Sequence, residues 1–171
     1  MNRPEDPLRD QVAALLPRLR RFARTIARHT ADADDLVQIT VERALVRLDQ
    51  WRSDTRLESW MFTIMKNAWI DEVRARVRRA RVLAPEEAGA NVGDVSADAQ
   101  VTAMSVEAAM ARLPEDQRIA VGLVLVEGLS YKEAAAVAEI PIGTLTSRLA
   151  RGREALMRML SNGEAHHEAT R

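Results

Sequence analysis

The sequence predicts an all-α protein, with two small helical domains joined by a flexible linker. Its apolar residues are mainly Ala, Leu, Val and Met, with few aromatics and only seven glycines among 171 residues, a composition that favours helices. Apolar residues recur at helical spacing on both sides of LAPEEAGANVGDVSADAQ, a segment without that period. We therefore place the domains at residues 8–82 and 104–160, the linker at 83–103 and a polar tail at 161–171.

The first block is expected to hold three helices, at about residues 10–29, 33–48 and 57–79, with the polar loop WRSDTR before the third. One face of the third helix should be buried, formed by Leu57, Trp60, Met61, Ile64 and Ala68. At this spacing Trp60 fits a core position better than a stacking platform for a base. The phase of Trp69 places it nearer the exposed side of the helix.

The second block is expected to hold helices at about residues 104–112, 115–127, 130–138 and 142–160. Pro114 stands where the second of these would begin, a position that suits proline. Ser130 and Glu133 form a capping box at the start of the third. Pro141 and Gly143 indicate a tight turn before the last helix.

The last helix has two chemically different faces. A buried stripe recurs at i, i+4, i+7 and i+11, formed by Leu145, Leu149, Gly152 and Leu156, and its glycine permits close helix packing. The opposite face carries hydrogen-bonding and cationic side chains, Thr144, Ser147, Arg148 and Arg151. Such side chains reach phosphates and base edges in the major groove, so the segment is typical of a helix-turn-helix. The alternative is an amphipathic helix with a solvated polar face.

Charge is distributed unevenly although the net charge is zero. Residues 1–82 carry 17 Lys and Arg against 12 Asp and Glu, whereas 83–104 carry four acids and no base. Six basic residues lie close together in one short stretch: Lys66, Arg74, Arg76, Arg78, Arg79 and Arg81. They could make several phosphate contacts, although such a run can also be only a solvated face.

Other function classes find little support. Without cysteine the chain has no disulfide or thiolate metal site. Apolar runs fall short of the roughly 20 residues that span a bilayer, and the N-terminus lacks the apolar core of a signal peptide, so we expect a cytoplasmic protein without membrane insertion. His29, His166 and His167 lack triad partners, and no glycine loop would cradle phosphate. We expect no enzyme, no metal and no cofactor.

Three motifs in two separated blocks carry a family resemblance. DADDLVQITVERAL resembles the polymerase-docking helix of the extracytoplasmic-function sigma factors, a branch of the sigma-70 family. SWMFTIMKNAWIDEVRARVRR resembles their promoter-melting helix, and LPEDQRIAVGLVLVEGLSYKEAAAVAEIPIGTLTSRLARGREAL resembles their reader of the minus-35 element. The resemblance covers about residues 16–81 and 106–160. It implies sigma domains 2 and 4, the second with the helix-turn-helix.

The resemblance also implies site residues. Contacts with minus-10 DNA would come from Arg52, Ser53, Asp54, Thr55, Arg56, Lys66, Asn67, Arg74, Arg76 and Arg78. Contacts with minus-35 DNA would come from Thr144, Thr146, Ser147, Arg148, Ala150 and Arg151. The face that docks on core polymerase would contain Asp34, Asp35, Leu36 and Gln38. The acidic pair could instead only favour the dipole at a helix start.

Three positions depart from the family pattern. Ile39 stands where many members carry an acid, Thr146 where many carry Lys or Arg, and Ala150 where a larger residue is common. The exact minus-35 sequence therefore does not follow from these residues. We expect readout to lean on Arg151 and on the shape of the DNA.

The implied function is promoter-specific transcription initiation in a stress response, with core RNA polymerase, promoter DNA and an anti-sigma factor as partners. Two alternatives stay open: a helix-turn-helix regulator that acts without polymerase, and a decoy that imitates a sigma factor to bind an anti-sigma protein. The acidic linker could mimic RNA near the polymerase active centre or serve only as a spacer.

Overall fold

The computed structural model describes residues 7–83 and 105–168, with side chains as far as Ser161. The first block contains α1 (Pro7–Ile26), α2 (Thr30–Val46), the short 3-10 helix η1 (Leu48–Gln50) and α3 (Leu57–Leu83). The second contains α4 (Val106–Arg112), α5 (Glu115–Val121), the π-helix η2 (Gly122–Val126), α6 (Tyr131–Ala138) and α7 (Ile142–Glu168). Every regular element in these ranges is helical, which confirms the all-α class. The predicted linker lies outside the described residues except for Leu83, which ends α3.

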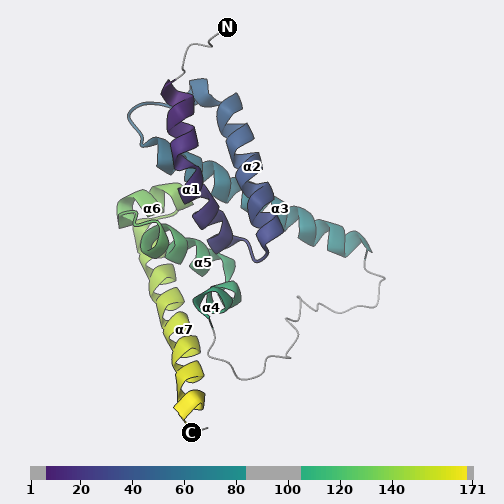
Figure 1. Cartoon of the computed structure of the whole chain (residues 1–171), viewed down its shortest axis with the longest axis vertical. Coiled ribbons are helices and arrows are strands. Elements are labelled where there is room, and N and C mark those ends of the chain that lie inside the picture. The colour runs from purple at the N-terminus through teal and green to yellow at the C-terminus, as the bar shows by residue number, and fades with distance from the viewer. Residues whose placement is uncertain (1–6, 84–104, 169–171) are drawn as a thin grey trace.

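The first block is a bundle in which α1 and α2 both pack against α3 (Figure 1). Phe22 of α1 and Phe62 of α3 are fully buried, and their rings meet edge to face with centroids 5.1 Å apart. This geometry is favourable for aromatic pairs because the positive edge of one ring faces the negative face of the other. The rings fix the two helices against each other at the centre of the core.

The predicted inner face of α3 is mostly confirmed, since Leu57, Met61, Ile64 and Ala68 are buried and Trp60 is half-buried. The placement of Trp69 near the exposed side is wrong, because that residue keeps only 4% of its surface exposed. The helical phase of α3 reflects only its packing within the first block, whereas α6 of the second block also packs on α3. Burial is therefore broader than a single apolar stripe.

The predicted single helix at 115–127 divides into α5 and η2. The amide of Glu127 donates to the carbonyl of Gly122 at 2.9 Å, an i+5 hydrogen bond that marks the wider π-helical turn. Gly122 lies against α1, where an added Cβ would stand 3.0 Å from the Thr25 methyl and 3.1 Å from the Phe22 ring. The glycine therefore lets the second block approach α1 closely.

Helix α7 extends to Glu168, so part of the predicted polar tail is helical. The buried stripe is confirmed, with Leu145, Leu149 and Gly152 buried and Leu156 half-buried. A Cβ on Gly152 would lie 2.8 Å from Cγ2 of Val121, which confirms that this glycine permits close packing of α7 on α5.

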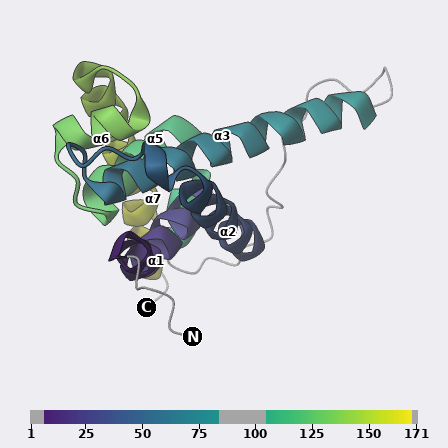
Figure 2. The ribbon, with the colours of Figure 1, turned by 90° about the horizontal axis from the view of Figure 1, so that it is seen from above.

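The two blocks pack directly on each other, which the sequence did not predict. One apolar core cluster includes buried residues of both blocks, and α1 lies against α4, α5 and η2. The C-terminal half of α3 projects away from the rest of the molecule (Figure 2). Among the described residues, no helix is both long and apolar enough to cross a membrane.

Candidate nucleic-acid interface

The helix-turn-helix is formed by α6, a three-residue turn and α7. The capping box is present, since Ser130 Oγ accepts from the amide of Glu133 and the Glu133 carboxylate accepts from the amide of Ser130. Glu139 ends α6 in the left-handed region, with φ 57° and ψ 42°. Pro141 precedes α7, whereas Gly143 lies inside its first turn and not in the turn before it.

The predicted minus-35 residues lie along the N-terminal half of α7. Thr144, Thr146, Ser147 and Arg148 are half-buried, whereas Ala150 and Arg151 are exposed. The hydroxyl groups of Thr146 and Ser147 each donate to a backbone carbonyl three residues earlier, both at 3.0 Å. Arg148 Nε lies 3.2 Å from a carboxylate oxygen of Asp116 on α5, so this guanidinium forms an ion pair within the second block. Arg151 is the predicted reader with the most accessible charge.

The loop before α3 is exposed from Arg52 to Arg56. The amide and the hydroxyl of Thr55 both donate to the carbonyl of Arg52 at 3.0 Å, which closes the loop into a tight turn. Arg52 and Asp54 form a loose pair at 3.8 Å. Arg56 pairs with Glu58 and, at 2.9 Å, with Glu133 of α6.

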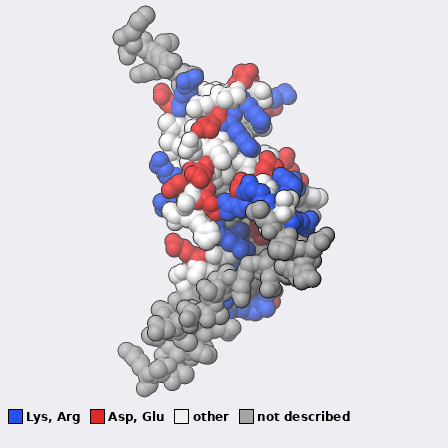
Figure 3. Space-filling model, turned by 90° about the vertical axis from the view of Figure 1, so that its right-hand side faces the viewer, with Lys and Arg blue, Asp and Glu red and all other residues white. Residues whose placement is uncertain are grey.

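The basic stretch of α3 is partly neutralised by acids of the first block. Arg76 binds both carboxylate oxygens of Asp32 at 2.7 and 2.8 Å and also binds Glu72, which Arg79 contacts too. The guanidinium of Arg76 holds the pKa values of Asp32 and Glu72 below their ordinary range. Figure 3, which faces the projecting end of α3, accordingly shows basic and acidic side chains interleaved. Arg74 and Arg78 are exposed on the same helix.

Lys66 and Asn67 lie where α3 meets the second block. Lys66 is 4% exposed, and its ammonium group pairs with the carboxylate of Glu139 in the helix-turn-helix. Asn67 is half-buried beside it. Lys66 first, and Asn67 to a smaller degree, favour the charged carboxylate and hold the pKa of Glu139 below its ordinary value. A cleft of about 260 Å³ next to this pair is lined by Arg74 and by Arg148, from opposite blocks.

The predicted docking face lies on α2. Asp34, Asp35 and Gln38 are exposed, as is the neighbouring Ile39, whose exposed fraction is 38%. Leu36 is 3% exposed and belongs to the core, so a direct contact of its side chain with a partner does not fit this arrangement. Its apolar character is explained by packing, because the inward face of α2 must be apolar to bury against α1 and α3.

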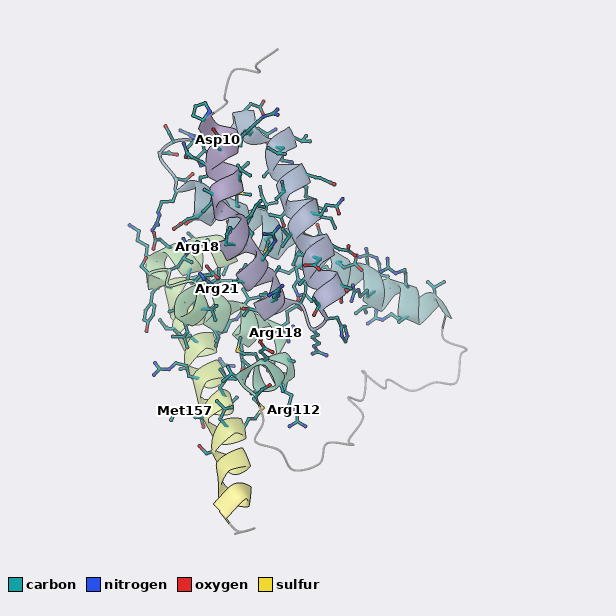
Figure 4. All side chains as sticks on the ribbon, viewed as in Figure 1. Asp10, Arg18, Arg21, Arg112, Arg118 and Met157 are labelled. Atoms are coloured by element: carbon teal, nitrogen blue, oxygen red, sulfur yellow. The ribbon has the colours of Figure 1, made fainter. Side chains whose placement is uncertain are left out.

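Sequence reasoning missed the polar groups that join the two blocks. Figure 4 shows Arg18 and Arg21 on α1. Both donate to the carboxylate of Glu127, which is fully buried. Arg118 is 2% exposed and donates to the carbonyls of Ile26 at 3.0 Å and Leu113 at 3.1 Å. Burial lowers the pKa of the Arg118 guanidinium. The one sequence signal was the charged residue inside the apolar run VGLVLVEGL.

Comparisons with known proteins cover both blocks. Residues 11–79 match the profile described as Sigma-70 region 2, and residues 103–156 match Sigma-70, region 4. The chain is 36% identical over 155 residues to the ECF RNA polymerase sigma factor EcfG of Rhodopseudomonas palustris, covering 91% of this chain and 86% of that protein. It is 37% identical over 142 residues to the ECF RNA polymerase sigma factor SigM of Mycobacterium tuberculosis, covering 83% and 71%.

A solved structure is also similar. It is the sigma factor RpoE in complex with the anti-sigma factor NepR from Bartonella quintana, with a TM-score of 0.74 and 31% identity over 90% of this chain and 96% of that one.

Proposed function

The chain belongs to the extracytoplasmic-function sigma factors of RNA polymerase, and on that premise we propose how its surfaces share the work of initiation. The second block reads minus-35 DNA through α7, the first block captures and opens minus-10 DNA through the 51–56 loop and α3, and the exposed acids of α2 dock on core polymerase. The protein is a transcription initiation factor that works in the cytoplasm and performs no catalysis of its own.

One observation carries this proposal. The same chain holds a capped helix-turn-helix in one block and, in the other, an exposed polar loop that leads into a helix carrying the amide of Asn67 and the exposed cations of Arg74 and Arg78. A regulator that only binds duplex DNA needs the first feature but not the second. Holding an unpaired base must offset an unstacking cost of a few kcal/mol, and amide, hydroxyl and cationic side chains close together suit that task.

The likeness to RpoE bound to NepR supports regulation by an anti-sigma factor. We propose that this regulation serves a stress response. Such a partner would hold the chain away from polymerase. An anti-sigma factor of the NepR type, added to the chain before core polymerase, should abolish runoff transcription. Undiminished transcription at saturating NepR would show that an anti-sigma factor of the NepR type does not inhibit this chain.

Strand opening tests the role of the first block. With core polymerase and a promoter carrying 2-aminopurine in its minus-10 element, Asn67→Ala should reduce the fluorescence rise that accompanies unstacking, because its amide no longer holds the freed base. Gln11→Ala, which removes an exposed amide from α1, is the matched control and should open the promoter normally. Equal opening by the Asn67 and Gln11 variants would overturn the assignment.

A further inference from the structure

We propose that Asp116 is a positioning residue for minus-35 DNA, which orients the guanidinium of Arg148 for a phosphate of the DNA backbone. The inference rests on the proposed function, because it takes α7 as the helix that reads minus-35 DNA. It adds that an acid on the neighbouring helix α5 strengthens this binding instead of repelling the DNA.

The carboxylate of Asp116 is held between two helices of the second block. Asp116 is the second residue of α5, and α5 packs directly on α7 (Figure 1). Its Oδ1 accepts a hydrogen bond from the amide of Gln117 at 2.9 Å, and its Oδ2 lies 3.2 Å from Nε of Arg148. One oxygen thus fixes the carboxylate to its own helix, while the other holds the arginine of α7.

The pair leaves the Nη edge of the Arg148 guanidinium free. A guanidinium carries five N–H donors in a rigid planar fork. Within the part of the chain that the structure describes, Nε makes the only ion-pair contact of this side chain, and neither Nη1 nor Nη2 has a partner. An edge formed by two such donors binds the oxygens of a phosphate in bidentate fashion.

Fixing this side chain in advance favours DNA binding. An arginine side chain carries about 2 kcal/mol of rotamer entropy, part of which is lost when a ligand immobilises it. The side chain of Arg148 is 32% exposed, so packing already restricts its stem, and Asp116 restricts the orientation of its guanidinium. A group that is ordered before the ligand arrives loses less entropy on binding.

The other polar side chains on this face of α7 have no carboxylate to orient them. The hydroxyl groups of Thr146 and Ser147 donate to carbonyls of α7 itself. Arg151 is exposed and forms no ion pair with any residue that the structure describes. A held arginine suits a phosphate, because phosphate contacts fix the register of a protein on the duplex, whereas a free arginine can adapt to a base edge.

Simple electrostatics predicts the opposite effect of Asp116. A carboxylate close to DNA repels the phosphates, so its removal should raise the affinity. If Asp116 positions Arg148, its removal should instead lower the affinity. The direction of the change therefore separates a positioning residue from an acid that only repels DNA.

A binding measurement on the full chain with core polymerase tests the proposal. The probe is a fluorescein-labelled duplex that carries only the minus-35 element of a promoter transcribed by this complex, read by fluorescence anisotropy. Asp116→Asn should lower the affinity about threefold, within the range of exposed ion pairs. Asp116→Glu keeps the charge and should recover most of the loss. Glu154→Gln removes the same charge from an exposed site on α7 and should change the affinity by less than about twofold.

A second background separates positioning from a general disturbance of the fold. Arg148→Ala alone should lower the affinity about tenfold and reduce the salt dependence by about one phosphate contact. In the Arg148→Ala background, Asp116→Asn should cause no further loss, because no guanidinium remains to be oriented. Equal losses in both backgrounds would overturn the proposal, and so would an unchanged or higher affinity of Asp116→Asn in the wild-type background.

Base preference and transcription complete the test. A phosphate contact carries no sequence information, so Asp116→Asn should weaken binding by the same factor on every single-base variant of the minus-35 element. A changed preference would show that Arg148 contacts a base, and would overturn the phosphate assignment. No transcription by the wild type with core polymerase would instead defeat the proposed function itself.

Discussion

Glu127 joins the two blocks, and its replacement by alanine is expected to weaken the packing between them. Its carboxylate is fully buried and accepts from Arg18 Nε at 3.1 Å and from Arg21 Nε and Nη2, both at 2.8 Å. These bonds also raise the pKa of the Arg21 guanidinium. Truncation removes the acceptor that the two arginines share, although Arg18 keeps Glu58 and the backbone carbonyl of Glu127 as partners.

The expected loss is about 2–3 kcal/mol. Removing one partner of a fully buried ion pair costs about 3–5 kcal/mol, but the side chains of Arg18 and Arg21 remain 28% and 53% exposed. Water can therefore solvate part of the freed charge, which lowers the cost. For a chain of this size the loss corresponds to a fall in Tm of about 4–12 °C.

Urea denaturation and calorimetry of the whole chain measure this effect. Glu154→Ala, at an exposed site of α7, is the matched control and should change stability by less than about 0.5 kcal/mol. A double-mutant cycle of Glu127→Ala with Arg21→Ala should give a coupling energy of about 1 kcal/mol or more. A loss below about 0.5 kcal/mol for Glu127→Ala would instead show that the packing of the two blocks does not depend on the ion pairs of Glu127 with Arg18 and Arg21.

Three further outcomes are expected. Gly152→Ala should destabilise by about 1–2 kcal/mol despite the better helix propensity of alanine, because its Cβ would lie 2.8 Å from Val121 Cγ2; a gain in denaturation experiments would contradict the close packing. Arg151→Ala should weaken binding to a minus-35 duplex by about 1–3 kcal/mol if it contacts a guanine in bidentate fashion, and unchanged affinity and base preference in a titration would remove that role. The hydrogen bonds from Ser130 hold the pKa of Glu133 at about 2, below its ordinary 4.5, so the unfolded chain binds a proton that the folded chain does not; the stabilisation is complete above about pH 4.5 and is lost as pH falls towards 2. Thermal melts of Glu133→Gln should show a shallower acid decline than the wild type, and identical declines would contradict this origin.

Local signals in the sequence were sufficient for most of the helices. The capping box at Ser130, the proline before α5 and the stripe ending at Gly152 each depend on neighbours within a few residues. Such short-range patterns can be read without knowing the fold. The same holds for the polar loop WRSDTR, which is exposed from Arg52 to Arg56.

The contacts between blocks could not be predicted, because they join residues far apart in the chain. Arg21 and Glu127 are 106 positions apart, and Lys66 and Glu139 are 73 apart. Helical phase alone placed Trp69 towards solvent, since it takes no account of a second block on the other side of α3. The π-helix had no local signal either, and its first residue, Gly122, packs against α1 of the other block.

The same contrast between local sequence patterns and contacts across the chain applies to the site residues. The family resemblance assigned Asp34, Asp35 and Arg151 to contacts with partners, and all three side chains are exposed. It could not show that Lys66 is covered, or that Leu36 is needed by the core.

Runoff transcription with purified core polymerase and a promoter library, in the presence and absence of the chain, is the most direct test of sigma function. New start sites are expected only when both proteins are present, and the promoters selected should share two elements at a fixed spacing. DNA binding that is independent of core polymerase, with no new start sites, would contradict it.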